Sequence, residues 1–359
     1  MIRTYLDHAA TTPLRPQALA ALEEGWRLWA NPSSPHAEGR AARRALEDAR
    51  ERIKNALGWT GELVFTSGAS EAAVLALNHA QAGSRLVSTV EHESILRAAT
   101  GATQLPVGSD GALDLDVMAR ELAAADDPLV AVQSLNSETG NRQDLCAIAE
   151  IVRAAGGLLL VDASQSAGKY QLPCAPDMVI LSAHKFGGPI GIGALLVKDW
   201  AMLRAGGGQE RGYRTGTENL PGALAMAAAL EAGGAACMTF DADEILLPFA
   251  AEIRAAGGTW LADRLAAPTR YIHALAMPNL SATAQLMRFD LAGIAVSQGS
   301  ACSSGSLRTS HVLAAIGLPD ELAARTIRIS LGWNTTRAEL QRFCDAWLGM
   351  ARPAAGRAA

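Results

Sequence analysis

Cysteine is scarce in this chain, and its few cysteines form no recognisable pattern. Five occur, widely separated and without a C-x-x-C pair: Cys146, Cys174, Cys237, Cys302 and Cys344. An odd number of scattered cysteines argues against a disulfide framework and against a zinc or iron–sulfur site. We therefore expect thiols that stay reduced, as in a cytoplasmic protein.

Long apolar runs and basic clusters are also missing. No stretch approaches the ~18 uninterrupted apolar residues of a membrane helix. The Ala-rich run at 221–236 is interrupted by Glu231 and Gly233, which favours a buried helix instead. No apolar stretch of the kind found in signal peptides follows Met1, so no secretory signal is expected. The formal charge is -5, and no Lys/Arg cluster alternates with aromatic residues. Neither nucleic acid nor a membrane is an expected partner.

What is present is enough apolar sequence for a large core, since 49% of the 359 residues are hydrophobic. Helical patterns precede a series in which short apolar strands alternate with helices. The predicted helices are 15–29, 37–57, 70–81, 93–100, 114–124 and 144–155, and the predicted strands are 62–66, 85–88, 103–107, 129–133, 157–162, 177–182 and 192–197. This alternation predicts an α/β fold with a mostly parallel seven-stranded sheet. Beyond about 243 the pattern changes to helices and irregular segments, which indicates a smaller second domain.

Polar residues follow three of these strands, where ligands bind in parallel sheets. The segment 66–71 (T-S-G-A-S-E) leads into a helix, whose start attracts phosphate but equally fits an ordinary N-cap. Asp162 ends a buried strand, where a carboxylate needs a cation or a turn to cap. Lys185 follows another strand in S-A-H-K-F-G-G-P. A desolvated lysine can form a Schiff base, although a turn lysine that reaches solvent would look the same.

Together these three features match the needs of a pyridoxal-phosphate (PLP) site, namely a phosphate cup, an acid for the ring nitrogen and a Schiff-base lysine. They occur at strand ends of one predicted sheet, in that order. The competing reading is a nicotinamide or nucleotide site. No G-x-G-x-x-G opens a helix and no P-loop motif occurs, which counts against it.

Two further residues have a setting that suggests chemistry. Cys302 lies in S-Q-G-S-A-C-S-S-G-S at 297–306, which predicts an exposed, mobile loop with a thiol suited to carrying a group between sites. Most free cysteines are instead small buried residues, as we expect for the other four. His92 follows the strand at 85–88, but a surface histidine at a helix start fits equally well. The polar, glycine-rich segment 206–219 is too long for a simple turn.

The ordered set of motifs resembles the cysteine desulfurases, which are PLP enzymes of the class V aminotransferase type. The motifs are S-G-A-S-E, E-H, N-S-E-T-G, D-A-S-Q-S, S-A-H-K, G-G-G-Q-E-R-G, G-T-E-N and G-S-A-C, and the likeness extends from Tyr5 to Gly332. It implies the PLP-transferase fold type I. The large PLP-binding domain would comprise 15–242. A smaller α+β domain, formed by 1–14 and 243–359, would carry the cysteine loop.

The resemblance also implies a role for each matched residue. Lys185 would hold PLP and shuttle the substrate Cα proton, His92 would stack on the ring and move protons, and Cys302 would accept sulfur as a persulfide. Asn31 and Arg328 would bind the carboxylate of L-cysteine. The cofactor-binding residues would be Ala69, Ser70, His92, Ser137, Asp162, Gln165, Ser182, His184, Lys185 and Thr217, the last reaching in from the second subunit of a homodimer.

The implied reaction converts L-cysteine to L-alanine and delivers persulfide sulfur to an acceptor, such as an iron–sulfur scaffold protein. One alternative is a selenocysteine lyase or another class V PLP aminotransferase or lyase. Another is a catalytically weakened subunit that binds partners for sulfur transfer. The chain departs from the family pattern at Ser137, which replaces the usual Asn before Glu138, and at Trp333 and Asn334, which replace the usual R-[FY] in L-G-R-[FY]-T.

Overall fold

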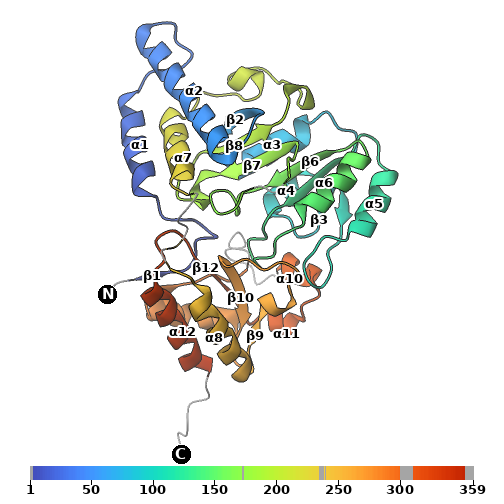
Figure 1. Ribbon diagram of the computed structural model, residues 1–359, viewed down its shortest axis with the longest axis vertical. Helices are drawn as coiled ribbons and strands as arrows, with labels where there is room; N and C mark the ends of the chain where they lie inside the picture. Colours follow the sequence, from blue (N-terminus) through green and yellow to red (C-terminus); the bar gives the residue numbers. More distant parts are fainter. Residues whose placement is uncertain (1–2, 172–173, 234–237, 239, 300–309, 352–359) are drawn as a thin grey trace, which may run out of the picture.

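A twisted seven-stranded sheet forms the centre of the larger of two lobes (Figure 1). The computed structural model describes residues 3–171, 174–233, 238, 240–299 and 310–351. The strands, in sheet order, are β2 (Glu62–Thr66), β8 (Gly193–Val197), β7 (Met178–Ser182), β6 (Leu158–Asp162), β5 (Leu129–Gln133), β3 (Arg85–Ser88) and β4 (Thr103–Leu105). The five strands from β7 to β4 are parallel, and β8 runs antiparallel to both β7 and β2. The predicted fold class is confirmed.

Helices cover both faces of this sheet because its central strands are apolar on both sides. Val179 and Leu181 of β7 pack into one core cluster, whereas Ile180 between them packs into another on the opposite face. The helices of this lobe are α1 (Pro16–Arg27), α2 (Ala37–Leu57), α3 (Ala69–His79), α4 (Glu93–Ala98), α5 (Leu115–Ala123), α6 (Leu145–Ala154) and α7 (Leu220–Glu231). The Ala-rich run forms the buried helix α7, as predicted, packed against α1 and α2.

The smaller lobe has its own apolar core, built around Phe249, Phe343 and Trp347. Its antiparallel sheet has the order β12 (Thr326–Ser330), β10 (Ile272–Ala276) and β9 (Thr259–Trp260). Its helices are α8 (Asp243–Ala255), α9 (Ala282–Leu291), α10 (His311–Ala315), α11 (Asp320–Ala323) and α12 (Arg337–Ala351). The N-terminal strand β1 (Thr4–Tyr5) pairs with β11 (Ile294–Ala295) of this lobe. The pattern beyond about 243 indicated only helices and irregular segments and missed these strands, whereas the resemblance implied the α+β composition that this lobe has.

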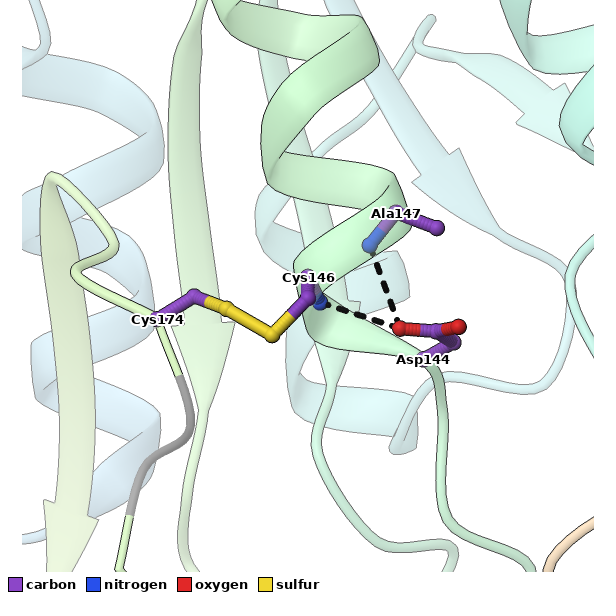
Figure 2. The surroundings of a disulfide bond; sticks show 4 residues. All are labelled: Asp144, Cys146, Ala147 and Cys174. Carbon is purple, nitrogen blue, oxygen red and sulfur yellow. Dashed lines mark hydrogen bonds between the residues drawn. A yellow bond between two sulfur atoms is a disulfide. The ribbon is translucent and has the colours of Figure 1, made fainter.

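Two cysteines are paired, contrary to the expectation that all of them stay reduced. Cys146, in the first turn of α6, forms a disulfide with Cys174, which lies between β6 and β7 (Figure 2). Their Cα atoms are 5.5 Å apart although 28 positions separate them in the sequence, so their spacing carries no sign of the bond. The prediction is wrong for this pair. Cys344 is a buried free thiol.

The described part of the chain contains no helix that is both long and apolar enough to cross a membrane.

Candidate active site

A cavity of about 580 Å³ opens at the carboxyl ends of the parallel strands and is closed on one side by residues of the smaller lobe. The large lobe supplies most of its lining, and Gly299, His311 and Arg328 come from the smaller lobe. Nine of the ten residues predicted to bind a cofactor line it: Ala69, Ser70, His92, Ser137, Asp162, Gln165, Ser182, His184 and Lys185. Side chains from five separate loops therefore meet in one space.

Lys185 enters the cavity from a short 3-10 turn, Ala183–Lys185, which directly follows β7. Its Nζ atom donates hydrogen bonds to the carbonyl oxygens of Ala9 at 2.7 Å and Ala10 at 2.9 Å. The chain can turn sharply here because Gly187 adopts a φ of +93°. A half-buried amine is thus held at the sheet edge by the N-terminal segment.

Asp162 and Gln165 follow β6, next to the lysine. The Asp162 carboxylate is 9% exposed, and its Oδ1 atom accepts the backbone N–H of Ser164 at 2.8 Å. Gln165 Nε2 donates to Ala9 O at 2.9 Å. Gln165 Oε1 is buried and has no hydrogen-bond partner among the described residues. Because buried polar atoms are normally satisfied, this oxygen indicates that the cavity is built for a polar ligand.

A candidate anion site lies where β2 passes into α3. Among the described residues no side chain caps the first turn of α3, which leaves its N–H groups available to a negatively charged ligand. Ser67, Gly68, Ala69 and Ser70 of this turn all line the cavity. Gly193 of β8 allows the turn to lie close, because a Cβ atom there would be 2.7 Å from the Cα of Gly68.

Two histidines of the cavity are neutral at pH 7. Burial and the nearby Lys185 charge lower the pKa of His184 to about 4, and its Nδ1 atom lies 3.1 Å from Thr11 Oγ1. Burial also lowers the pKa of His92. The nearby Asp162 charge raises this pKa in part, and the Lys185 charge lowers it further. His92 caps the start of α4, since its Nδ1 atom accepts the Ser94 N–H.

Arg328 reaches the cavity from β12 and is almost fully buried, with 3% of its surface exposed. Its Nη2 atom forms an ion pair with Asp7 Oδ1 at 2.7 Å. Its Nη1 atom donates to the carbonyl oxygens of Ser137 at 2.8 Å and Gly299 at 3.3 Å. The guanidinium is therefore oriented by both lobes. At position 137 it contacts the backbone, which any residue supplies.

The lining residues that were not predicted from the sequence include Glu91, Glu138 and His311. Glu91 is fully buried, and burial raises its pKa well above the ordinary value. Glu138 accepts the Ser310 hydroxyl at 2.5 Å, and burial raises its pKa as well. His311 Nε2 lies 3.0 Å from Glu91 O. Both acids belong to motifs singled out above, E-H and N-S-E-T-G, which lie in the segments that follow β3 and β5.

Other predicted site residues lie elsewhere. Asn31 is exposed outside the cavity, where its Oδ1 atom accepts the Ser33 N–H at 2.8 Å. Thr217 is also exposed and does not line the cavity. Cys302, most of the predicted mobile loop at 297–306, and the Ala-rich tail lie outside the described residues.

Comparisons with known proteins agree with one another. The family model described as aminotransferase class-V matches residues 4–343. A protein of Cereibacter sphaeroides named cysteine desulfurase is 38% identical, over 96% of this chain and 95% of its own length. Another from Dictyoglomus turgidum, named cysteine desulfurase IscS, is 33% identical, over 95% and 92%.

The fold is similar to that of solved structures. A NifS-like protein from Rickettsia africae superposes with a TM-score of 0.82 at 27% identity, covering 97% of this chain and 99% of its own.

Proposed function

The chain belongs to the aminotransferase class-V family and, within it, to the cysteine desulfurases, and on that premise we propose that it takes the sulfur from L-cysteine and holds it as a persulfide on Cys302. The other product is L-alanine. In the net reaction the Sγ–Cβ bond of the substrate breaks, an S–S bond forms at Cys302, and Cβ takes up a proton. No external oxidant or reductant is needed for this transfer.

The family implies PLP as the cofactor, and the cavity residues fit that group. Lys185 would bind it covalently, Asp162 would face its ring nitrogen and Gln165 its ring oxygen. The uncapped start of α3 would hold its phosphate, together with Ser182 and His184. The unpartnered Oε1 atom of Gln165 supports this fit. When bound, PLP withdraws the electrons released at the substrate Cα.

Proton transfer would fall to Lys185 and His92. The Lys185 amine is held at the cavity wall by two backbone carbonyls, from which it can turn toward a substrate Cα proton. His92 is uncharged at neutral pH, so one of its ring nitrogens can accept a proton. A base and an acid that lie near one another are what acid–base chemistry requires.

Arg328 would bind the substrate carboxylate. Its Nη1 atom now contacts two carbonyl oxygens, whereas a carboxylate would offer a stronger, charge-assisted bond. Asp7 keeps the guanidinium in place through Nη2. Asn31, predicted to assist, stays a prediction because it lies outside the cavity of the single chain.

The position of the residues that flank segment 300–309 supports Cys302 as the sulfur acceptor. Gly299, on one side, lines the cavity, and so does His311, beyond the other side. Ser310 donates to Glu138 in the cavity wall. The described chain therefore meets the cavity on both sides of segment 300–309, close to where a substrate would bind.

We further propose a homodimer, in which the exposed Thr217 of one subunit completes the cavity of the other. The persulfide would pass to an acceptor protein, for example an iron–sulfur scaffold. No role for nucleic acid or a membrane is proposed. The location would be the cytoplasm, where the Cys146–Cys174 disulfide would be uncommon.

The single observation that carries this function is that Lys185, Asp162, His92 and Arg328 line one cavity. The experiment is to measure alanine and sulfide formation from L-cysteine, with a thiol reductant, on the purified chain supplied with PLP. We expect both products. Lys185→Ala should abolish turnover and the visible absorbance of bound PLP, whereas Cys302→Ala should keep the absorbance and lose sulfide release.

Two results would favour the alternatives. If Cys302→Ala released sulfide from cysteine at the wild-type rate, the chain would act as a selenocysteine lyase or another class V enzyme. If the wild-type chain bound PLP but formed no alanine, a weakened sulfur-transfer subunit would be the better description. In that case the Ser137 position would be the first to examine.

A further inference from the structure

We propose that Cys146 and Cys174 form a reversible dithiol–disulfide centre on the larger lobe, which a dithiol reductant opens and which sets the backbone conformation of Cys174 and of residues 163–171. The exchange needs only these two sulfur atoms and a reductant. It therefore does not rest on the proposed desulfurase activity.

The pair is accessible without unfolding. Cys146 is exposed at the first turn of α6, and Cys174 is half-buried beside the core. Disulfides that solvent reaches are the ones that thiols reduce readily, whereas buried ones are protected. Cys344 offers the contrast, because it is a buried free thiol whose pKa burial raises to about 12. It is therefore inert at neutral pH.

The exchange balances as two successive displacements. A thiolate of the reductant attacks the exposed Cys146 sulfur, so that the Cys146–Cys174 bond breaks and Cys174 leaves as a thiolate. The second thiol of the reductant then attacks the mixed disulfide and releases Cys146. Two cysteines gain two electrons and two protons, and the reductant becomes a disulfide. Oxidation by a disulfide of the same class reverses both steps.

Opening the bond would release a strained backbone on one side only. Cys174 has a φ of 97°, a conformation that residues other than glycine rarely adopt. On the other side, Asp144 fixes the start of α6, since its Oδ1 atom accepts the N–H groups of Cys146 at 3.2 Å and Ala147 at 3.1 Å (Figure 2). Movement on reduction therefore falls on the Cys174 side.

That side leads to functional parts of the molecule. The connection that contains Cys174 starts at Asp162 and carries Gln165, both of which line the cavity. Tyr170, on the same connection, shares a hydrogen bond of 2.7 Å with Thr269 of the smaller lobe. Reduction or formation of the disulfide would thus affect the cavity lining and the contact between the lobes.

A redox titration of the full chain tests the exchange. The protein is equilibrated under native conditions in buffers of reduced and oxidised dithiothreitol, its thiols are trapped by alkylation, and the 146–174 cross-link is quantified by mass spectrometry. We expect a reversible two-electron transition. Cys344→Ser should titrate like the wild type, whereas Cys146→Ser should show no transition. A cross-link that resists excess dithiothreitol until the protein unfolds would overturn the proposal, as would a pair that never forms.

Hydrogen exchange of the peptide covering 163–171 tests the conformational consequence. We expect roughly tenfold faster exchange in the reduced protein than in the oxidised one, because local opening becomes easier. Cys174→Ser should match the reduced form in any buffer, and Cys344→Ser should follow the wild type. Equal exchange in both redox states would show that the bond does not set this conformation.

Discussion

Buried carboxylates are the unusual residues of the cavity. Glu91 and Glu138 lie beside Asp162 and Arg328, respectively, and burial raises the pKa of both glutamates. A raised pKa brings the protonation of a carboxyl group closer to neutral pH. Glu138 is the more informative of the two, because its Ser310 partner immediately follows the segment that carries Cys302.

Replacing Glu138 with Gln should slow sulfur transfer more than proton chemistry. The amide keeps the volume of the side chain but weakens the bond from Ser310 by about 1 kcal/mol, which corresponds to roughly fivefold slower persulfide formation. Rapid-quench measurement of the Cys302 persulfide reports this step, and exchange of the Cα proton of L-alanine in D2O reports on Lys185. Ser310→Ala is the matched variant. Unchanged persulfide rates in both variants would argue that Glu138 has no such positioning role.

A second residue-scale prediction concerns acid stability. His273 is buried, stacks on Trp260 at 4.8 Å, and has a pKa that burial lowers to about 4. The unfolded chain binds this proton near pH 6.5, so the stability due to neutral His273 is complete above pH 6.5 and is lost as the pH falls toward 4.

His273→Phe keeps a ring against Trp260 but cannot be protonated. Urea unfolding between pH 6.5 and pH 4 should therefore show a smaller loss of stability in the variant, by up to about 3 kcal/mol. His8, whose pKa burial lowers to about 3, remains as a source of acid sensitivity in both proteins. Parallel pH profiles for the two proteins would contradict the prediction.

Single residues also show where reading the sequence succeeds and where it stops. Lys185 and Asp162 could be recognised because an ionic side chain directly after an apolar strand is conspicuous. Glu91 and Glu138 also lie in segments that follow strands, but in the sequence they look like ordinary helix-start or turn residues. The Cys146–Cys174 pair had no local signal at all, because the bond depends on how α6 packs beside the connection after β6.

At the scale of elements, the close approach between β8 and the start of α3 determines the anion site. A Cβ atom at Gly193 would lie 2.5 Å from Leu181 O and 2.7 Å from Gly68 Cα, both of which are backbone atoms that cannot rotate away. Gly193→Ala should therefore cost about 1–3 kcal/mol of stability and weaken PLP binding.

The matched control for this variant is Gly349→Ala. Gly349 lies exposed within α12, and a Cβ atom there would meet nothing within 4 Å. That change should raise stability by up to about 1 kcal/mol through helix propensity and leave PLP binding unchanged. Thermal unfolding and visible absorbance measure the two effects. Equal stability and equal PLP binding in the two variants would mean that the close approach at Gly193 is not needed for the anion site.

The elements of the two lobes differ in how readily they can be predicted. Most strands from β2 to β8 were predictable because they are short apolar runs, such as L-V-A-V-Q in β5 and M-V-I-L-S in β7. Strand β4 reads T-Q-L and has little apolar sequence. Strand β10 reads I-H-A-L-A and β9 has only two residues, so neither carries a β-branched or alternating pattern strong enough to recognise. Strand β12 places Ile327 and Ile329 in the core of its lobe and Arg328 toward the cavity. Arg328, which we propose binds the substrate, thus lies in the same short strand as two residues of the apolar core.

At the scale of the whole molecule, Trp333 links the lobes at a position where the family usually has Arg. Its Nε1 atom donates to Pro13 O at 2.9 Å, and the guanidinium of Arg15 lies over its ring, 5.4 Å from the centroid. Arg15 in turn donates to Phe186 O at 3.0 Å, directly after Lys185. Trp333 therefore supports the turn that carries Lys185, with Arg15 as the intermediate residue.

Comparing two substitutions separates the contributions of Trp333. Trp333→Phe keeps a ring beneath Arg15 but loses the bond to Pro13, which should cost about 1 kcal/mol. Trp333→Ala loses both and leaves Arg15 without its aromatic neighbour, which should cost about 3 kcal/mol and raise the rate at which PLP dissociates. Calorimetric melting temperatures and PLP release, followed by absorbance, measure these effects. If the alanine variant melted like the phenylalanine variant, the contact between Arg15 and the ring would be incidental to stability.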